Sequence, residues 1–600
     1  MNANQSRRLI DPGTSSVSNN TKAKTDNATP YQGRELDNDS IRLVEIEPAA
    51  HGGDAVVCRL SVVPFASRPK FEALSYRWGT ENEKGTITLN GLPFEVTRNL
   101  LDALLFLRRQ AASGEAHQPF WIDAICINQS DVAERNRQLR IMKEIYLRAS
   151  TVVVWLGSRY AEFQSDLAAK ESHKPEGGSP QRDNSIQREM IQTLQKDEYW
   201  GRLWIIQEIG EAKQLRVCFG DMSASWDVFM DLLAMHHCDG DTGPLRLDRL
   251  LRKEKYSGSH TLKRLLEEHR EAKCAEPRDK IYGLVGLASD AAGFLMDYNK
   301  SLYEVWKDTM EFMNYRELFE TESQILPVGA LVKSLLMANY TDPWSQILKV
   351  HEDQVDSTKL IVNPDRNNPL VFRLTAVLLG CIGRVGPSAG DIVARPSESL
   401  RWRANIQQLF SADELGPAHQ ENDRLLRILL ASDDSEVAKM CFNRPSTVCW
   451  KQFRIGSTHW GRYFQSPGQQ TRLTTLGSSS RTKTPRSTDQ SNSVQPRLYM
   501  VKGSFYHPTP RKMGVASGLV RPGDLVCYVK SSKRTLLIRA EEESNEYTSL
   551  RVFGTALTTD DMCGSIQDAD QVRQWRLLKE DVKRRVEVQL DAGTIFMLLE

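Results

Sequence analysis

Acidic and amide side chains follow a short apolar segment in the first third of the chain. Residues 119–123 read PFWID, and the turn after them carries Asn128, Gln129 and Asp131. Apolar residues at helical spacing come next, and the run VVVWL at 152–156 has the composition of a buried strand. Strand, helix and strand in this order predict a parallel βαβ unit, whose ligand sites lie at the carboxyl ends of its strands. We therefore expect polar chemistry around Asp123.

Asp123 itself allows two interpretations. Its carboxylate could orient a bound ligand, or it could cap the turn by accepting backbone N–H groups, which is the common structural role of such an Asp. The capping role is the favoured one. Asp131 and Glu134 have the spacing of a capping box, so this pair is predicted to begin the next helix.

Two other groups of residues could carry chemistry. Cys126 lies downstream of His117, but no further group is present to orient a nucleophile, so a small buried thiol is the favoured interpretation. The run His236-His237-Cys238 has no partner cluster, and adjacent helical histidines point apart, so no metal site is predicted. Nucleotide-binding glycine loops and the HExxH pattern do not occur in the sequence.

Composition limits the class of protein. The 600 residues are 26% charged and 40% hydrophobic, with a formal net charge of +1. This near balance of charge does not favour binding to nucleic acid or to an anionic membrane surface. The amino-terminus lacks the apolar core of a signal peptide, and the longest apolar run, at 374–382, is far shorter than the ~20 residues of a membrane span. Ten scattered cysteines indicate reduced thiols, so a cytoplasmic protein is expected.

Several predicted strands, a hairpin and a helix precede the βαβ unit and must position these residues. Strand patterns occur at 41–46, 56–63 and 71–76, and Asn90-Gly91 predicts a hairpin before a helix that begins at Thr97. Later segments change in composition.

The expected organisation is a disordered tail at 1–40, an α/β domain at 41–221, a mainly helical region at 222–465, a low-complexity linker at 466–497, and a β-rich region with a terminal helix at 498–600.

Three blocks resemble the fungal heterokaryon-incompatibility (HET) domain in order and spacing. They are ALSYRWG at 73–79, WIDAICINQ at 121–129 followed by Asp131 and Glu134, and RLWIIQE at 202–208. The RDKIY block at 278–282 and the GDLV strand at 523–526 are similar to segments that follow this domain in long fungal relatives.

A remoter similarity is to Toll/interleukin-1 receptor (TIR) domains. The residues LSYR at 74–77, at the end of the first core strand, resemble the Leu-Ser-Phe-Arg turn of these domains, and residues 120–123 resemble their second strand. Trp204 and Glu208 match the Trp-x-x-x-Glu of NAD-cleaving TIR domains. The resemblance implies an α/β fold with a TIR/flavodoxin-like, mostly parallel sheet in the HET domain.

The same resemblance implies an NAD glycohydrolase in which Glu208 is the catalytic carboxylate. Such a carboxylate stabilises the oxocarbenium-like centre formed when nicotinamide leaves. Trp204 would supply an apolar shelf, while Ser75, Arg77 and Asp123 would bind ribose or phosphate. NAD would be the substrate, with no cofactor and no metal. The structural alternatives are that Glu208 pairs with Arg202 or Lys213 on a helix face, and that Arg77 is a salt-bridge partner.

The resemblance thus implies an effector of heterokaryon incompatibility and programmed cell death, in which an NAD-cleaving activity is one hypothesis. The rival hypothesis is a non-catalytic signalling or self-assembly module that recruits partners through the HET domain. A third is a regulator that has lost the death role. Because the sequence shows no nucleotide switch or repeat array, a protein partner or self-association is the expected trigger.

Overall fold

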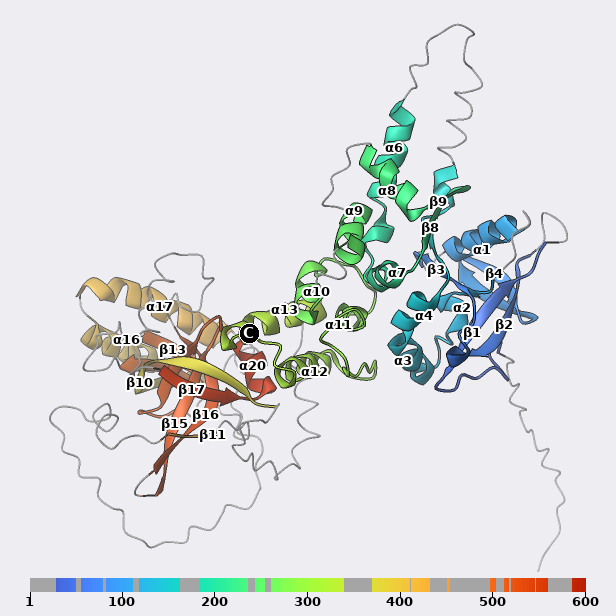
Figure 1. Ribbon diagram of the computed structural model, residues 1–600. Coiled ribbons are helices and arrows are strands. Elements are labelled where there is room, and N and C mark those ends of the chain that lie inside the picture. Colours follow the sequence, from blue (N-terminus) through green and yellow to red (C-terminus); the bar gives the residue numbers. More distant parts are fainter. Residues whose placement is uncertain are drawn as a thin grey trace, which may run out of the picture. The chain divides into compact units, whose positions relative to one another are not determined.

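The protein divides into two compact units, each described by itself. The computed structural model describes residues 29–49, 55–78, 83–111, 118–161, 184–235, 243–253, 260–338, 370–410, 412–431, 450–453, 497–502, 512–516, 520–544, 547–558 and 585–599. The first unit comprises 1–138, 148–181 and 213–226, and the second comprises 139–147, 182–212 and 227–600. Figure 1 shows the chain coloured along its sequence.

The first unit contains a nine-stranded sheet in the order β5-β4-β2-β1-β6-β3-β7-β8-β9. Its centre is parallel, since β3 pairs with β6 and β7, and β7 pairs with β8. Antiparallel pairs flank this centre on both sides. The strands are β1 (Ser40–Ile46), β2 (Val57–Pro64), β3 (Glu72–Tyr76), β4 (Lys84–Leu89), β5 (Leu92–Thr97), β6 (Phe120–Trp121), β7 (Val152–Trp155), β8 (Leu215–Phe219) and β9 (Met222–Ser225).

The sequence pattern explains this centre. All four residues of β7, VVVW, are buried, as expected for a parallel strand covered on both faces. The predicted hairpin is confirmed, because Leu89 pairs with Leu92 and both Asn90 and Gly91 have positive φ, at 54° and 82°. The α/β class of the amino-terminal part is therefore confirmed.

Helices connect the strands of this part of the chain. Helix α1 (Arg98–Ala111) packs against β4 and β5. The helix predicted after Asp131 forms as two successive helices, α3 (Val132–Arg140) and α4 (Met142–Arg148). A short helix, α2 (Asp123–Cys126), precedes them and begins at the carboxyl end of β6.

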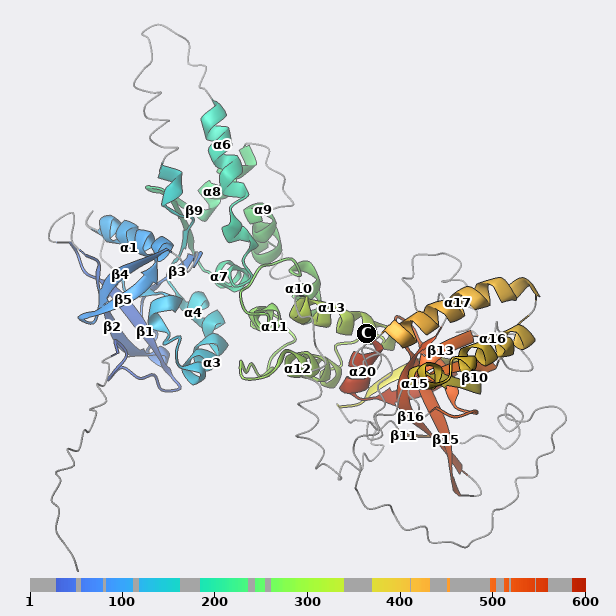
Figure 2. The same cartoon turned by 180° about the vertical axis from the view of Figure 1, so that it is seen from behind.

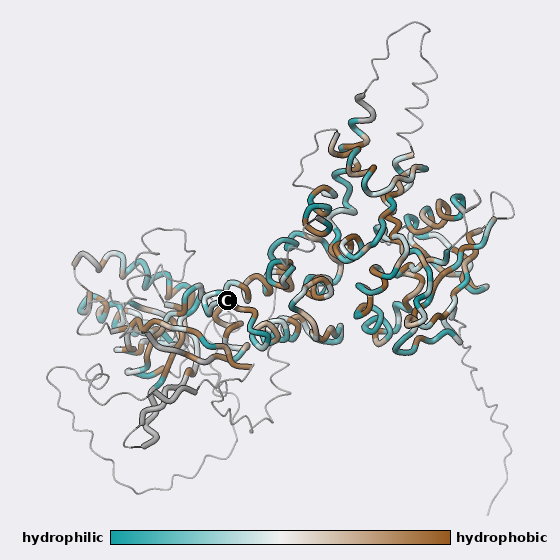
Figure 3. The backbone as a smooth tube through the Cα atoms, viewed as in Figure 1, coloured by the Kyte–Doolittle hydropathy of each residue, from teal (hydrophilic) through white to brown (hydrophobic). Residues whose placement is uncertain are grey.

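The second unit contains most of the remaining helices. The expected helical middle is confirmed, and α13 is coloured largely as hydrophobic in Figure 3. These helices are α6 (Asn184–Gln195), α7 (Ile205–Glu211), α8 (Trp226–Met235), α9 (Gly243–Leu247), α10 (Leu262–Glu268), α11 (Asp279–Val285), α12 (Leu302–Tyr315) and α13 (Ile325–Met337).

The carboxyl-terminal part of this unit is a closed antiparallel barrel. Strand β10 (Phe372–Ser388), from a stretch that the sequence placed in the mainly helical region, pairs with β12, β14 and β17. The barrel closes because β16 pairs with both β13 and β15. The other strands are β11 (Trp450–Phe453), β12 (Arg497–Lys502), β13 (Lys512–Ala516), β14 (Leu525–Val529), β15 (Thr535–Ser544), β16 (Tyr547–Thr558) and β17 (Arg585–Leu590).

Helices cover this barrel and join it to the helical middle. Figure 2 shows α16 (Ser397–Leu409) and α17 (Ala412–Ala431) side by side over β10 and β13, next to the short α15 (Ala389–Ala394). The last helix, α20 (Ala592–Leu598), packs against α12 and α13. There the Phe596 ring lies 4.8 Å from the ring of Trp306, and the Lys333 ammonium lies 4.2 Å from the Phe596 ring centre. The carboxyl-terminal helix therefore packs against the helical middle of the second unit.

Several expectations fall partly or wholly outside the described residues. These are the tail up to residue 28, the linker up to residue 496, and most of the stretch around 571–585 in which the terminal helix was expected. Residues 29–40, placed in the tail by sequence, contact the first unit, since the Tyr31 hydroxyl donates to the Ile125 carbonyl over 3.1 Å. Over the described parts of the chain, no helix is both long and apolar enough to cross a bilayer.

Candidate functional site

The first two sequence blocks meet at the carboxyl ends of β3 and β6. The Trp78 indole N–H donates to Asp123 Oδ2 over 2.8 Å, and Asp123 Oδ1 accepts the Ala124 backbone N–H over 2.7 Å. Trp78 is 42% exposed. The Asp123 carboxylate thus accepts the N–H of the next residue and orients an exposed indole, while Ile122, at the cap position of α2, makes no side-chain cap bond.

The other two candidates from the first block lie beside this pair. Ser75 is fully buried within β3, so its hydroxyl does not face solvent. Arg77 is half-buried, and its carbonyl accepts the Asn99 amide over 2.5 Å. Asn99 also accepts the Trp155 indole N–H over 3.2 Å. Asn99 therefore joins the carboxyl ends of β3 and β7, which the sequence alone did not indicate.

The turn after Asp123 is built by side-chain bonds to the backbone. Gln129 donates to the Asp123 carbonyl over 3.0 Å, and Asp131 accepts the Glu134 N–H over 3.0 Å. This second bond is half of the predicted capping box. The Glu134 side chain makes a different contact, because it accepts the Asn128 N–H over 2.6 Å. Glu134 therefore fixes the turn from inside rather than closing the box.

A buried ion pair stabilises the same turn. Arg42 on β1 donates to both carboxylate oxygens of Glu134, over 2.6 and 2.9 Å, and also to the Cys126 carbonyl over 3.0 Å. Sequence reasoning missed Arg42. The signal was present, since Arg42 shares a strand face with apolar Val44, and an arginine among core residues requires a partner.

Cys126 is the small buried thiol that was favoured over a nucleophile. It is 1% exposed, and burial raises its pKa to about 12. A thiol with such a pKa carries almost no thiolate at neutral pH, and the thiolate is the reactive form. The geometry therefore supports a structural role for Cys126.

The third block lies on α7 in the second unit. The Trp204 indole N–H donates to Asp279 Oδ2 over 2.9 Å, and the Tyr298 hydroxyl donates to Asp279 Oδ1 over 2.6 Å. Glu208 lies one turn after Trp204 and is only 2% exposed. The RDKIY block at 278–282 thus supplies Asp279, the carboxylate that holds Trp204, and sequence reasoning had assigned Asp279 no role.

Close packing brings the same two segments together. Gln207 donates to the Gly283 carbonyl over 2.9 Å. A Cβ atom on Gly286 would lie 2.7 Å from the Gln207 amide nitrogen, so α11 approaches α7 through a residue without a side chain. Helices α7 and α11 therefore form one packed pair within the second unit.

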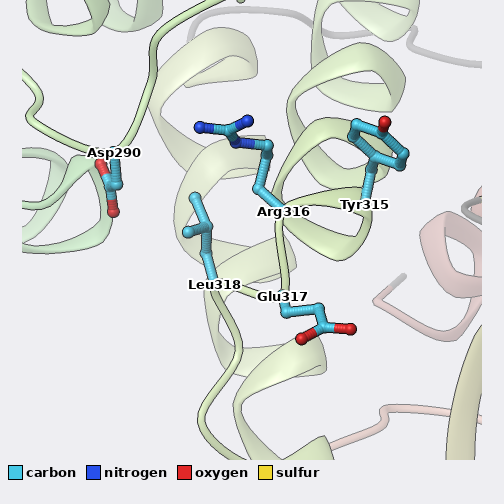
Figure 4. A pocket seen from close by; sticks show the side chains of 5 residues that line it. All are labelled: Asp290, Tyr315, Arg316, Glu317 and Leu318. Atoms are coloured by element: carbon cyan, nitrogen blue, oxygen red, sulfur yellow. The ribbon is translucent and has the colours of Figure 1, made fainter.

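The five predicted site residues are thus divided between the two units. Ser75, Arg77 and Asp123 lie in the first, and Trp204 and Glu208 lie in the second. A hollow of about 430 Å³, shown in Figure 4, lies in the second unit. None of the five lines it; its lining residues are Asp290, Tyr315, Arg316, Glu317 and Leu318. The described residues include no group of three or more His, Cys, Asp or Glu placed to hold a metal, and 236–238 lie outside them.

Comparison with known proteins agrees with the three blocks. Residues 71–208 match the family model described as "Heterokaryon incompatibility protein (HET)". "Heterokaryon incompatibility protein 6, OR allele" of Neurospora crassa is 28% identical over 370 residues, which cover 48% of this chain. The chain spans about half, 54%, of that relative. No solved structure matches. Residues 71–208 of this chain are therefore similar to the heterokaryon-incompatibility family, and they contain all three blocks.

Proposed function

We propose that this protein acts in heterokaryon incompatibility, the fungal response in which fusion of genetically different cells leads to cell death. The match over residues 71–208 and the printed name of the relative support this role.

We further propose that the domain works as a non-catalytic binding module. The observation that carries this is the enclosure of Glu208, which is 2% exposed on a helix whose seven residues are all buried. A carboxylate that stabilises charge on a substrate must reach the reacting atoms. An exposed side chain of the blocks lies elsewhere, at Trp78 beside the half-buried Asp123, and a protein partner could bind there.

NAD cleavage at Glu208 is the second candidate mechanism. The strand order β6-β3-β7-β8 favours it, because numbering these parallel strands along the chain gives 2-1-3-4, as in flavodoxin-like and TIR folds. The order reverses between β3 and β7, where such sheets bind ligands, and Arg77 follows β3. In this mechanism α7 must first expose Glu208, which is 2% exposed.

One experiment separates the two mechanisms. Purified full-length protein is incubated with NAD, nicotinamide release is followed, and the same variants are expressed in a fungal host whose growth is scored. Glu208→Gln is compared with Glu198→Gln, which alters an exposed acid upstream on the same segment. The binding-module mechanism predicts no nicotinamide and equal growth arrest from both variants.

The contrary outcomes are equally specific. Nicotinamide release that Glu208→Gln abolishes and Glu198→Gln retains, with melting temperatures unchanged, would replace the binding module by NAD cleavage. Normal growth with the wild-type protein, in both single strains and fused mixed strains, would refute the incompatibility role itself.

A further inference from the structure

Trp78 presents an unusual surface in the first unit. Nearly half of its side chain is exposed, although its indole N–H is already bonded to Asp123. Within the described residues, no aromatic ring and no cation stacks on it. What the side chain offers to a ligand is therefore its ring face, held at a fixed angle beside a carboxylate.

This combination selects a particular chemistry. The face of an indole attracts cations, and arginine is the side chain that most often stacks on it. The Asp123 carboxylate adds a negative charge, and Glu81 and Glu83 follow Trp78 in the sequence. The adjacent cation, Arg77, is half-buried. An arginine-bearing segment next to apolar residues fits this surface best.

The chain itself carries such a segment. The first described residues reach the short helix that carries Asp123: the Tyr31 hydroxyl donates to the carbonyl of Ile125, two residues after Asp123. Asn90 also donates to the Pro30 carbonyl over 2.8 Å, which fixes the point of entry. The 28 residues upstream contain one stretch that is both basic and apolar, Arg-Arg-Leu-Ile at 7–10.

We propose that Arg7 and Arg8 of this chain dock on the ring face of Trp78 beside Asp123 and so cover the surface in cis. The roughly 20 residues between Arg8 and Thr29 can span up to about 70 Å when extended, which is ample. A tether of this length gives an effective concentration on the order of millimolar, so a weak contact suffices. Leu9 and Ile10 add apolar area against the indole. A protein partner would have to displace this segment.

Trypsin tests the contact in the full chain. Cleavage after Arg7 and Arg8 is followed by mass spectrometry of the released peptides, with cleavage after Lys22 and Lys24 as the internal standard. Trp78→Ala should raise the rate at Arg7 and Arg8 at least threefold relative to the two lysines. Trp78→Phe, which keeps a ring face, should raise it less. Met222→Ala removes another exposed apolar side chain from the same unit and should change nothing.

A labelled peptide tests the same surface in trans. Its sequence is that of residues 5–12, and binding to full-length protein is measured by fluorescence anisotropy. The Arg7→Ala/Arg8→Ala protein should bind the peptide at least threefold more tightly than the wild type, because its own segment no longer competes. Adding Trp78→Ala to that protein should abolish binding.

Two results would overturn the proposal. One is equal trypsin cleavage at Arg7 and Arg8 in the wild type and in Trp78→Ala. The other is peptide binding that does not depend on Trp78, which would assign the surface to a different partner. Neither measurement involves cell death or NAD, so the proposed function is not at stake in them.

Discussion

Arg42 and Glu134 are joined by two parallel hydrogen bonds, of 2.6 and 2.9 Å, in the interior of the first unit. Their side chains are 1% and 4% exposed. The pair links β1 to the turn that carries the second block, because Glu134 also accepts the Asn128 N–H and Arg42 donates to the Cys126 carbonyl. The signature turn therefore depends on a strand about 90 residues away in sequence.

Breaking this pair should be costly. Glu134→Gln leaves the Arg42 charge buried without a counter-ion, so the free energy of unfolding should fall by about 3–5 kcal/mol. Urea unfolding of the full chain measures it. Glu95→Gln is the matched control, because the Lys84–Glu95 pair is exposed and such pairs contribute at most about 1 kcal/mol. Similar losses for both variants would contradict the structural role of the pair.

The contact between α7 and α11 predicts opposite effects at two glycines. Gly286→Ala places a Cβ atom 2.7 Å from the Gln207 amide nitrogen, so it should destabilise the protein by about 1–3 kcal/mol. Gly210→Ala on α7 meets only ordinary contacts of 3.6 Å or more, and alanine favours a helix. That variant should be neutral or more stable by about 0.5–1 kcal/mol. A lower melting temperature for Gly210→Ala than for Gly286→Ala would refute this packing.

Glu311 on α12 should give the stability a pH dependence. Burial is the main cause that raises the pKa of its carboxyl to about 7; Lys307 opposes this shift, and Asp308 and Asp591 add to it. The folded protein therefore holds this proton more tightly than the unfolded chain, so stability should fall as the pH rises from about 4.5 to about 7. Glu311→Gln should reduce this pH-dependent loss in the free energy of unfolding by about 1–2 kcal/mol. Parallel pH profiles for wild type and variant, measured by melting temperature, would contradict the assignment.

Substitution of a core residue of the first unit should lower the free energy of unfolding more than substitution of Asp123. Val153 on β7 is 1% exposed and pairs with Leu74 on β3, so Val153→Ala should cost about 2–3 kcal/mol and reduce the yield of folded protein. Asp123→Asn keeps the shape but has one acceptor oxygen for two N–H donors, so it should cost only about 1 kcal/mol. Thermal unfolding compares them. A larger loss for Asp123→Asn would mean that Asp123 is chiefly structural.

The sequence alone predicted features that depend on neighbouring residues. The run VVVW required a strand buried on both faces, Asn90-Gly91 required a turn with positive φ, and the three blocks identified the HET domain. These signals are local, because strand burial, turn geometry and a motif are each written in a few consecutive residues. The NAD mechanism and the roles of the five site residues stay predictions.

Only the tertiary structure decided which distant residues meet. It paired Arg42 with Glu134 and Trp204 with Asp279, placed Trp78 on the surface, and made β10 a barrel strand. A buried charge or indole N–H needs a partner, but it does not specify from which part of the chain that partner comes. Pairings across tens of residues depend on the packing of the whole core, and local patterns do not encode them.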